Sequence, residues 1–557
     1  MQAITQALER AIHDLFNIDM TVTLTRPAEQ FGDFATNIAL QLAGKLERPP
    51  REVAAEVAAR LQENSDGLVK SVEIAGPGFI NIMLADVVIL QTAQKSVTTK
   101  PQNFAGQTVV TEYSDPNPFK VLHAGHFYTS VIGDSISRII KAAGGDVHAV
   151  NFGGDVGLHV GKTMWAMLQE LGGEHPEKLA DVPEDRRSEW MAGAYVRGTQ
   201  AYEEDETAKA EIIAINKHVY QLHTDDDHVS LFARIYWTTR QWSYDYFDDF
   251  YARIGTPFER YYPESETAPL GLQTVREQLE KGVYQESDGA VVFDGEKYGL
   301  HTRVFINSHG LPTYEAKDVG LIMSKWRDYH FDRSVIVTAN DITEYMKVVL
   351  KSIEQFAPEL AERTTHITHG NVKLAGGTKM SSRKGNFLRA ADVLDAAHAA
   401  NKQANDRDDE QAVLGAIKYA FLKQRIGADI IYLPEESVSL EGNSGPYLQY
   451  AHARARSILA KADHAPAAIT SLEPGERSLA RKIGEYSEVV QRAADDMMPH
   501  HICTYLYELA QTFNRFYEHN RVIDDPRQAI RLQLVQLYAD VLKDGLGLLG
   551  IEAPEHM

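Results

Sequence analysis

Residues 109–151 alternate in the pattern of a strand, an apolar helix and a second strand. The first strand pattern covers 109–113, and apolar side chains then recur at helical spacing between Phe127 and Ile140. A glycine pair ends the helical pattern, and residues 147–151 return to a strand pattern. Two strands joined by a crossover helix are the unit of a parallel sheet, so this part of the chain is predicted to be α/β.

The sequence on either side of this unit has other patterns. Residues 1–100 mix amphipathic helix patterns with two short strand patterns, which predicts a small α+β domain. Residues 105–390 are predicted to form the parallel-sheet domain, with a helical insertion at about 162–251. From 391 to 557 the pattern is almost entirely helical. One buried helical stripe is predicted there from Ile502, Leu506, Leu509, Phe513 and Phe516.

Composition limits the possible classes of protein. The 557 residues include one cysteine, Cys503, which excludes an intramolecular disulfide and is typical of a reducing compartment. No apolar run reaches the roughly 18 residues of a transmembrane helix, and no apolar signal core follows the N-terminus. A cytoplasmic protein without a membrane partner is therefore expected. The formal net charge of -22 opposes an RNA partner unless one face is locally basic.

Acidic residues cluster in the predicted insertion. The runs Glu203–Glu206 and Asp225–Asp227 could suggest metal sites, but such runs are more typical of solvated helix faces and loops. No structural metal is predicted.

The first chemical motif is His123-Ala124-Gly125-His126, between the first strand and the apolar helix. Free N–H groups and the dipole at a helix N-terminus favour phosphate, and Gly125 lets a nucleotide approach the backbone closely. Imidazole donors then stabilise charge that develops on a phosphate oxygen. Alone, the pair fits a zinc site or two helix-capping histidines better.

The second motif is the cationic, glycine-flanked run Lys379 to Asn386. Its ammonium and guanidinium groups could neutralise a triphosphate, although alone the run fits a solvated surface loop equally well. The two motifs occur in the order and context of the HIGH and KMSKS motifs, and together they resemble those of class I aminoacyl-tRNA synthetases.

The flanking residues narrow the resemblance to one family. The run from Glu112 to His126 is similar to the extended first motif of arginyl-tRNA synthetases. Further runs resemble the N-terminal and anticodon-binding domains of that family: Phe31–Asn37, Gly76–Asn81, Gly442–Arg454 and Leu509–Tyr517. The resemblance implies a Rossmann-like catalytic domain and a monomer. It also implies that L-arginine is activated with ATP and Mg²⁺ and transferred to tRNA(Arg).

The resemblance also implies which residues hold arginine. A guanidinium group requires carboxylates in planar, bidentate geometry. Glu112 and Asp318 match the family positions that supply them, and Asn117 and Tyr314 match two further arginine contacts. The spacing places Tyr314 and Asp318 on one helix face. Without the resemblance, Glu112 fits a charge at a sheet end and Asp318 a solvated helix residue.

The remaining candidate residues concern ATP. The resemblance implies catalytic roles for His123, His126, Lys120, Lys379, Arg383 and Lys384, and ATP contacts for Gly125, His126, Met380 and Ser381. Asp155 lies in a loop that matches the family only in part and is a further candidate. Two departures are Ser382, where the second motif usually has lysine, and Ile342, where relatives often have a substrate-contacting glutamine.

Two other functions remain open from the sequence. One is a related class I synthetase or nucleotidyltransferase with another substrate, which would leave Glu112 and Asp318 without a cation. The other is an inactive paralogue that only binds RNA. The presence of His123, His126 and Lys379 argues against it.

Overall fold

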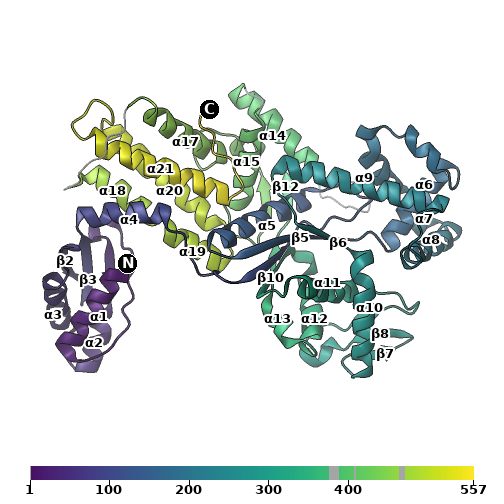
Figure 1. Cartoon of the computed structure of the whole chain (residues 1–557), viewed down its shortest axis with the longest axis horizontal. Helices are drawn as coiled ribbons and strands as arrows, with labels where there is room; N and C mark the ends of the chain where they lie inside the picture. Colours follow the sequence, from purple (N-terminus) through teal and green to yellow (C-terminus); the bar gives the residue numbers. More distant parts are fainter. Residues whose placement is uncertain (1, 375–387, 407–408, 463–470) are drawn as a thin grey trace.

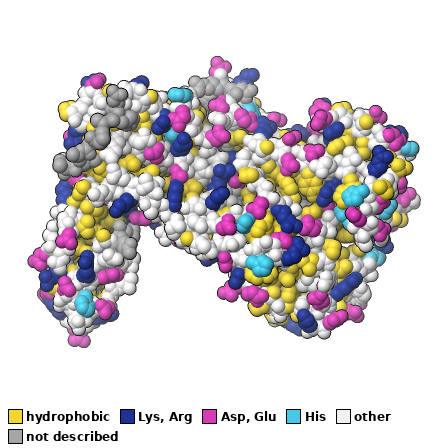
Figure 2. Space-filling model, in the orientation of Figure 1, with side chains coloured by type: hydrophobic (Ala, Val, Ile, Leu, Met, Phe, Trp, Pro, Cys, Tyr) yellow, Lys and Arg dark blue, Asp and Glu magenta, His cyan; other side chains and the backbone are white. Residues whose placement is uncertain are grey.

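The computed structural model describes residues 2–374, 388–406, 409–462 and 471–557. The chain consists of a small N-terminal α+β unit, a central parallel sheet flanked by helices and a C-terminal helical bundle, which confirms the predicted fold class (Figure 1). Within these ranges, no helix is long and apolar enough to cross a membrane. Figure 2 shows cationic and acidic side chains interspersed over the face in view.

The central sheet has five parallel strands in the spatial order β11–β10–β4–β5–β6. The predicted strand–helix–strand unit forms its middle, and the strands and first helix are β4 (Thr108–Glu112), α5 (Ala124–Ala142), β5 (Asp146–Gly153), β6 (Arg260–Pro263), β10 (Arg333–Ala339) and β11 (Thr364–His369). Counted from β6, the strands follow in chain order three, two, one, four, five. The connections therefore diverge between β4 and β10. In such sheets, ligands bind in the crevice beyond the carboxyl ends of the two strands at this point.

The insertion between β5 and β6 is helical, as predicted. Its helices are α6 (Leu158–Leu171), α7 (Arg187–Glu204), α8 (Glu206–Thr224) and α9 (Leu231–Ile254). They lie at the end of the molecule opposite the N-terminal unit (Figure 1). The carboxylates at 203–206 and 225–226 are exposed, which confirms that these runs face solvent.

Residues 290–293 and 303–306 have strand patterns in the sequence and form strands, but these strands lie outside the parallel sheet. They are β8 (Ala290–Phe293) and β9 (Arg303–Ile306), and they pair antiparallel in a small separate sheet with β7 (Gln285–Ser287). Their connections contain no crossover helix, and parallel pairing requires one. The surrounding elements are α10 (Glu264–Glu280), α11 (Tyr314–Tyr329), α12 (Thr343–Glu354), α13 (Pro358–Arg363) and β12 (Val372–Leu374).

The N-terminal unit is a three-stranded antiparallel sheet with helices. Its elements are α1 (Gln2–Phe16), β1 (Phe34–Thr36), α2 (Ile38–Leu46), α3 (Pro50–Glu63), β2 (Val69–Ala75), β3 (Phe79–Leu84) and α4 (Asp86–Thr98). Helix α4 leaves this unit and packs against the C-terminal bundle. Arg477 of the bundle bridges Asp33 and Asp86, so buried ion pairs join the two regions.

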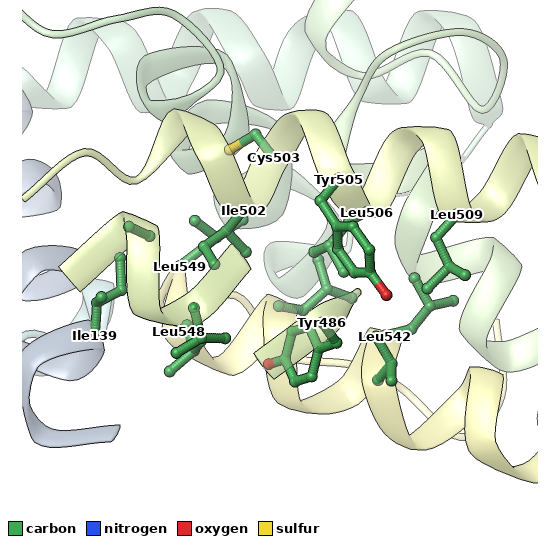
Figure 3. Packing of buried hydrophobic residues seen from close by; sticks show 14 of the residues in the cluster. Ile139, Tyr486, Ile502, Cys503, Tyr505, Leu506, Leu509, Leu542, Leu548 and Leu549 are labelled. Atoms are coloured by element: carbon green, nitrogen blue, oxygen red, sulfur yellow. The ribbon is translucent and has the colours of Figure 1, made fainter. Parts of the chain in front are cut away.

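The C-terminal region is a helical bundle with one short strand, and several of its helices pack on α5. Its elements are α14 (Ala390–Asn405), α15 (Glu410–Leu422), β13 (Ile430–Tyr432), α16 (Pro434–Ser437), α17 (Gly445–Leu459), α18 (Pro474–Ile483), α19 (Tyr486–Asp496), α20 (His500–His519) and α21 (Gln528–Leu548). The predicted stripe of α20 is buried at all five positions. Figure 3 shows part of it against Leu542 and Leu549, with Ile139 of α5 beside them. The bundle thereby supports the helix that begins at the first motif.

Candidate active site

A cavity of about 780 Å³ opens beyond the carboxyl ends of β4 and β10. Glu112 ends β4, and the backbone then turns away through Ser114 and Asp115, both at positive φ. Val337 to Ala339 supply the end of β10, and the first turn of α5 closes a third side. The cavity therefore occupies the place where the topology predicts a ligand. It contains both carboxylates of the predicted arginine site and both histidines of the first motif.

The two histidines cap helix α5 reciprocally. The backbone N–H of His123 donates to Nδ1 of His126 (3.2 Å), and the N–H of His126 donates to Nδ1 of His123 (3.3 Å). An Nδ1 atom that accepts carries no proton, so each neutral ring holds its proton on Nε2 as a donor. Burial lowers the pKa of His123 to about 4 and that of His126 well below the ordinary value, so both rings are neutral donors.

Gly125 permits this arrangement of the rings. The imidazoles stack with their centroids 3.6 Å apart. A Cβ atom on Gly125 would lie 2.8 Å from the His123 ring, so a larger residue would displace the ring. The helix N-terminus and two imidazole N–H groups thus form a site for negative charge.

Glu112 and Asp318 both line the cavity, and each is held by a different partner. Glu112 is 2 % exposed, and its carboxylate accepts from Nζ of Lys325, a residue of α11 with no exposed surface. Asp318, also on α11, accepts from the hydroxyl of Tyr345 on α12. Burial raises the pKa of Asp318 to about 8, and the nearby Glu112 carboxylate adds to that effect.

The other two predicted arginine contacts also line the cavity. Tyr314 stands one helical turn before Asp318 at the start of α11, as the spacing predicts, and its side chain is half exposed at the rim. Asn117 uses its Oδ1 atom to accept the backbone N–H of Gly154 (2.8 Å), which fixes the loop after β4 against the end of β5. A Cβ atom on Gly154 would lie 2.6 Å from that oxygen, so glycine is required there.

Lys120 lines a neighbouring cavity of about 370 Å³ that shares Asn117, His123 and His126 with the first. Its ammonium group lies 4.6 Å from the ring centroid of Tyr195 on the insertion helix α7. Burial lowers the pKa of Lys120 to about 8. The lysine thus places a partly buried cation in the cavity next to the histidines. It can pair with a phosphate that enters this neighbouring cavity beside the rings.

Asp155 does not line either cavity that contains the other candidates. The residue is fully buried, and its carboxylate accepts from Nε of Arg240 (2.9 Å) and from the backbone N–H of Ser265 (2.8 Å). These bonds join β5, the insertion and α10. The structure thus supports a structural role for this candidate.

Asp155→Ala is expected to destabilise the catalytic region by about 3 kcal/mol, because it leaves the mostly buried Arg240 guanidinium without its counter-ion. The Michaelis constant for arginine should stay within about twofold of the parent value, since a residue outside the cavity contributes less than about 0.4 kcal/mol to binding. Urea unfolding and steady-state kinetics measure both effects. A higher KM for arginine at unchanged stability would contradict the structural role and indicate that Asp155 belongs to the binding site.

The second motif lies outside the described residues, which stop at 374 and resume at 388. Its candidates Lys379, Met380, Ser381, Arg383 and Lys384 therefore remain predictions. The chain on both sides of the gap reaches the site: Val372 and Leu388 line the cavity, and the backbone N–H of Ala124 donates to the carbonyl of Leu388 (2.8 Å).

Several residues in or beside the cavity were not identified from the sequence. Lys325 and Tyr345 hold the two carboxylates, and Lys317 pairs with Glu264 at the cavity wall. Ile342 also lines the cavity, at the position where the sequence departs from its relatives. Within the described ranges, no group of three or more His, Cys, Asp or Glu side chains could hold a metal ion.

Comparison with known proteins covers the three regions separately. Residues 88–434 match the family model described as tRNA synthetases class I (R), catalytic domain. Residues 1–84 match the arginyl tRNA synthetase N terminal domain, and residues 448–557 match the DALR anticodon binding domain.

Full-length relatives agree with these matches. An arginine–tRNA ligase of Porphyromonas gingivalis is 29% identical over 600 residues, covering 100% of both chains. That of Treponema denticola is 30% identical, covering 96% of this chain and 94% of the relative. Among solved structures, the arginyl-tRNA synthetase of Thermus thermophilus superposes with a TM-score of 0.79 at 26% identity, covering 100% of both chains. The chain belongs to the arginyl-tRNA synthetase family of class I aminoacyl-tRNA synthetases.

Proposed function

We propose that the cavity at the end of β4 and β10 joins L-arginine to ATP as arginyl-adenylate and then transfers the arginyl group to the terminal adenosine of tRNA(Arg). The observation that supports this most is the placement of two buried carboxylates and two neutral histidine donors in one cavity. Such a cavity offers a guanidinium group its counter-charge at one end and a phosphate its donors at the other.

In the first step, the α-carboxylate of arginine attacks the α-phosphorus of ATP, and the bond to the β-phosphate oxygen breaks. Glu112 and Asp318 bind the guanidinium, while Asn117 and Tyr314 orient the rest of the amino acid. The N–H groups of His123 and His126 donate to the oxygens of the reacting phosphate as its charge grows. Neutral rings serve here, because their task is to donate hydrogen bonds and not to transfer protons.

Pyrophosphate leaves toward cationic groups. Lys120 lines the neighbouring cavity together with both histidines, and this position supports a role in neutralising that leaving group. Lys379, Arg383 and Lys384 of the second motif share this role in the proposal, and Met380 and Ser381 contact the nucleotide. Mg²⁺ enters with ATP as part of the substrate, as such nucleotides usually bring it.

The proposal predicts that the protein exchanges pyrophosphate into ATP with arginine and with no other standard amino acid. The assay is run with and without tRNA(Arg), because relatives usually need bound tRNA before activation. Exchange driven by another amino acid, with none from arginine in either condition, would overturn the proposal.

Arginine binding is also expected to depend on pH. Because the pKa of Asp318 is raised to about 8, most free protein below that pH holds a proton on the carboxyl that must meet the cation. The kcat/KM for arginine should rise about tenfold per pH unit up to about pH 8 and then level off. The KM for ATP serves as the control, since it should not follow this profile. An arginine profile that stays flat over this range would contradict the assignment.

A further inference from the structure

The two carboxylates predicted to hold arginine, Glu112 and Asp318, differ in the charge of their partners. Glu112 accepts from Lys325, whose ammonium group also donates to Oγ of Ser334 on β10 (3.0 Å). Both side chains of the ion pair are almost fully buried, at 3% exposure for Glu112 and 0% for Lys325. The pair therefore adds no net charge to the cavity.

Asp318 has a neutral partner instead. Its carboxylate accepts from the hydroxyl of Tyr345, and among the described residues no lysine or arginine lies within ion-pairing distance of it. Glu264, another acidic residue of the wall, is paired with Lys317. Among the described residues, Asp318 thus differs from both Glu112 and Glu264 in having no cation of its own, and it shares this property with Asp115, which accepts from the backbone N–H of Phe152 (2.9 Å).

Helix α11 creates this difference. Asp318 and Lys325 stand seven residues apart, two turns along one helix face, so the same helix supplies one carboxylate and the cation that neutralises the other. Tyr345 is held in place from the other side. The guanidinium of Arg303 lies 5.4 Å from the ring centroid of Tyr345 and bonds to Glu315 (3.2 Å).

We propose that these two carboxylates have unequal tasks: Lys325 holds Glu112 in an ion pair without net charge, and Tyr345 orients Asp318, which of the two supplies the counter-charge that selects arginine. Lys325 and Tyr345 are positioning residues in this account. The inference rests on the proposed function and assigns the charge selection within the same site to one carboxylate.

Charge removal at the two carboxylates tests this difference. In Glu112→Gln/Lys325→Met the whole ion pair is replaced, so that no buried charge remains alone. We expect the KM for arginine to rise by about tenfold, as for the loss of one hydrogen bond. Citrulline, the uncharged isostere of arginine, should remain a poor inhibitor. The ratio of its inhibition constant to the KM for arginine should equal that of the parent protein. Asp318→Asn should instead bring the inhibition constant of citrulline close to the KM for arginine.

Equal loss of the arginine preference in both variants would overturn the inference. Lys325→Met alone is the companion variant, since it leaves Glu112 charged and buried. It should lose far more activity or folded protein than the double variant. If adding Glu112→Gln restores activity and folding, the unpaired charge of Glu112 was the cause of the loss. A double variant that is no better than Lys325→Met also contradicts the inference.

Tyr345→Phe tests the orienting hydroxyl. It removes one hydrogen bond to a charged group, so the KM for arginine should rise roughly ten- to hundredfold, with kcat little changed. The same bond favours the ionised carboxylate, so its loss should also move the pH profile of arginine binding to higher pH. A merely structural tyrosine would not move that profile.

Other groups around Asp318 could contribute to the profile, and they stay in place in this variant. They are Glu112 of β4, Asp115 of the following loop, Glu264 of α10, Arg303 of β9 and Lys325 of α11. The matched control is Tyr284→Phe, which removes another buried tyrosine hydroxyl bonded to α12, at Ser352 (3.1 Å), outside the cavity. Its kinetics and pH profile should equal those of the parent. Equal changes in both variants, or an unchanged profile in Tyr345→Phe, would remove Tyr345 from this role.

Measurements on the parent protein distinguish a failure of this inference from a failure of the proposed function. If it exchanges pyrophosphate with arginine but the variants behave alike, the division of tasks is wrong and the proposed function stands. If the parent protein uses another amino acid, the proposed function itself fails.

Discussion

Asp318→Asn is expected to reduce kcat/KM for arginine by about a thousandfold, or about 4 kcal/mol of transition-state stabilisation. The asparagine keeps the size of the side chain but removes the negative charge, and its amide N–H groups then face the N–H groups of the guanidinium. Because Asp318 is buried, no water can replace the lost partner, and the arginine cation would be left without a counter-charge. Arginine-dependent pyrophosphate exchange measures the loss.

A second substitution on the same helix provides the control. Asp328 lies at the far end of α11, where it bonds to Arg260 (2.5 Å) and to the hydroxyl of Tyr262 (2.7 Å). Asp328→Asn should affect stability, with kcat/KM for arginine within a few-fold of the parent value. Comparable losses in the two variants would mean that Asp318 supports the helix and does not bind arginine.

His126→Ala is expected to lower kcat by about a thousandfold while the KM for arginine changes little. The ring donates from Nε2 into the phosphate end of the cavity, and that bond should strengthen most in the transition state. The substitution also removes one half of the reciprocal cap, which costs about 1 kcal/mol of helix stability. Single-turnover measurement of arginyl-adenylate formation isolates the chemical step.

His366→Ala is the control for the loss of a buried imidazole. His366 lies on β11, and burial likewise lowers its pKa to about 4, but it is bonded to Thr338 (2.7 Å) and does not line the cavity. Its variant should retain nearly the parent rate of adenylate formation. A His126→Ala protein that is correctly folded and equally fast would exclude the proposed stabilisation of the phosphate.

The parts of the fold predicted from sequence are those set by local periodicity. Helix α5 and its flanking strands follow from one apolar pattern, and the stripe of α20 follows from another. The pairing of β8 and β9 did not follow, because strand patterns report burial on one face and not which strand lies beside it. Connection length, which excludes parallel pairing here, is the signal that distinguishes the two sheets.

In the site, too, only the residues of a local sequence pattern could be predicted. The motif residues could be named because they lie at the ends of β4 and the start of α5, where one short segment carries the chemistry. Lys325 is 213 residues from Glu112 in the chain, and Tyr345 is 27 from Asp318. No periodic pattern links such pairs. In the sequence, Lys325 and Tyr345 look like ordinary residues of helix faces that pack on a core. Their partners become evident only when the sheet and α11 are assembled.

The account depends on one orientation of the substrate, with the guanidinium at the carboxylates and the phosphate at the histidines. A crystal structure with a non-hydrolysable arginyl-adenylate analogue tests this most directly. We predict that the guanidinium bonds to Asp318 and Glu112 and that Nε2 of His126 bonds to a phosphate oxygen. A guanidinium bound anywhere else, or a phosphate remote from the histidine pair, would contradict the account.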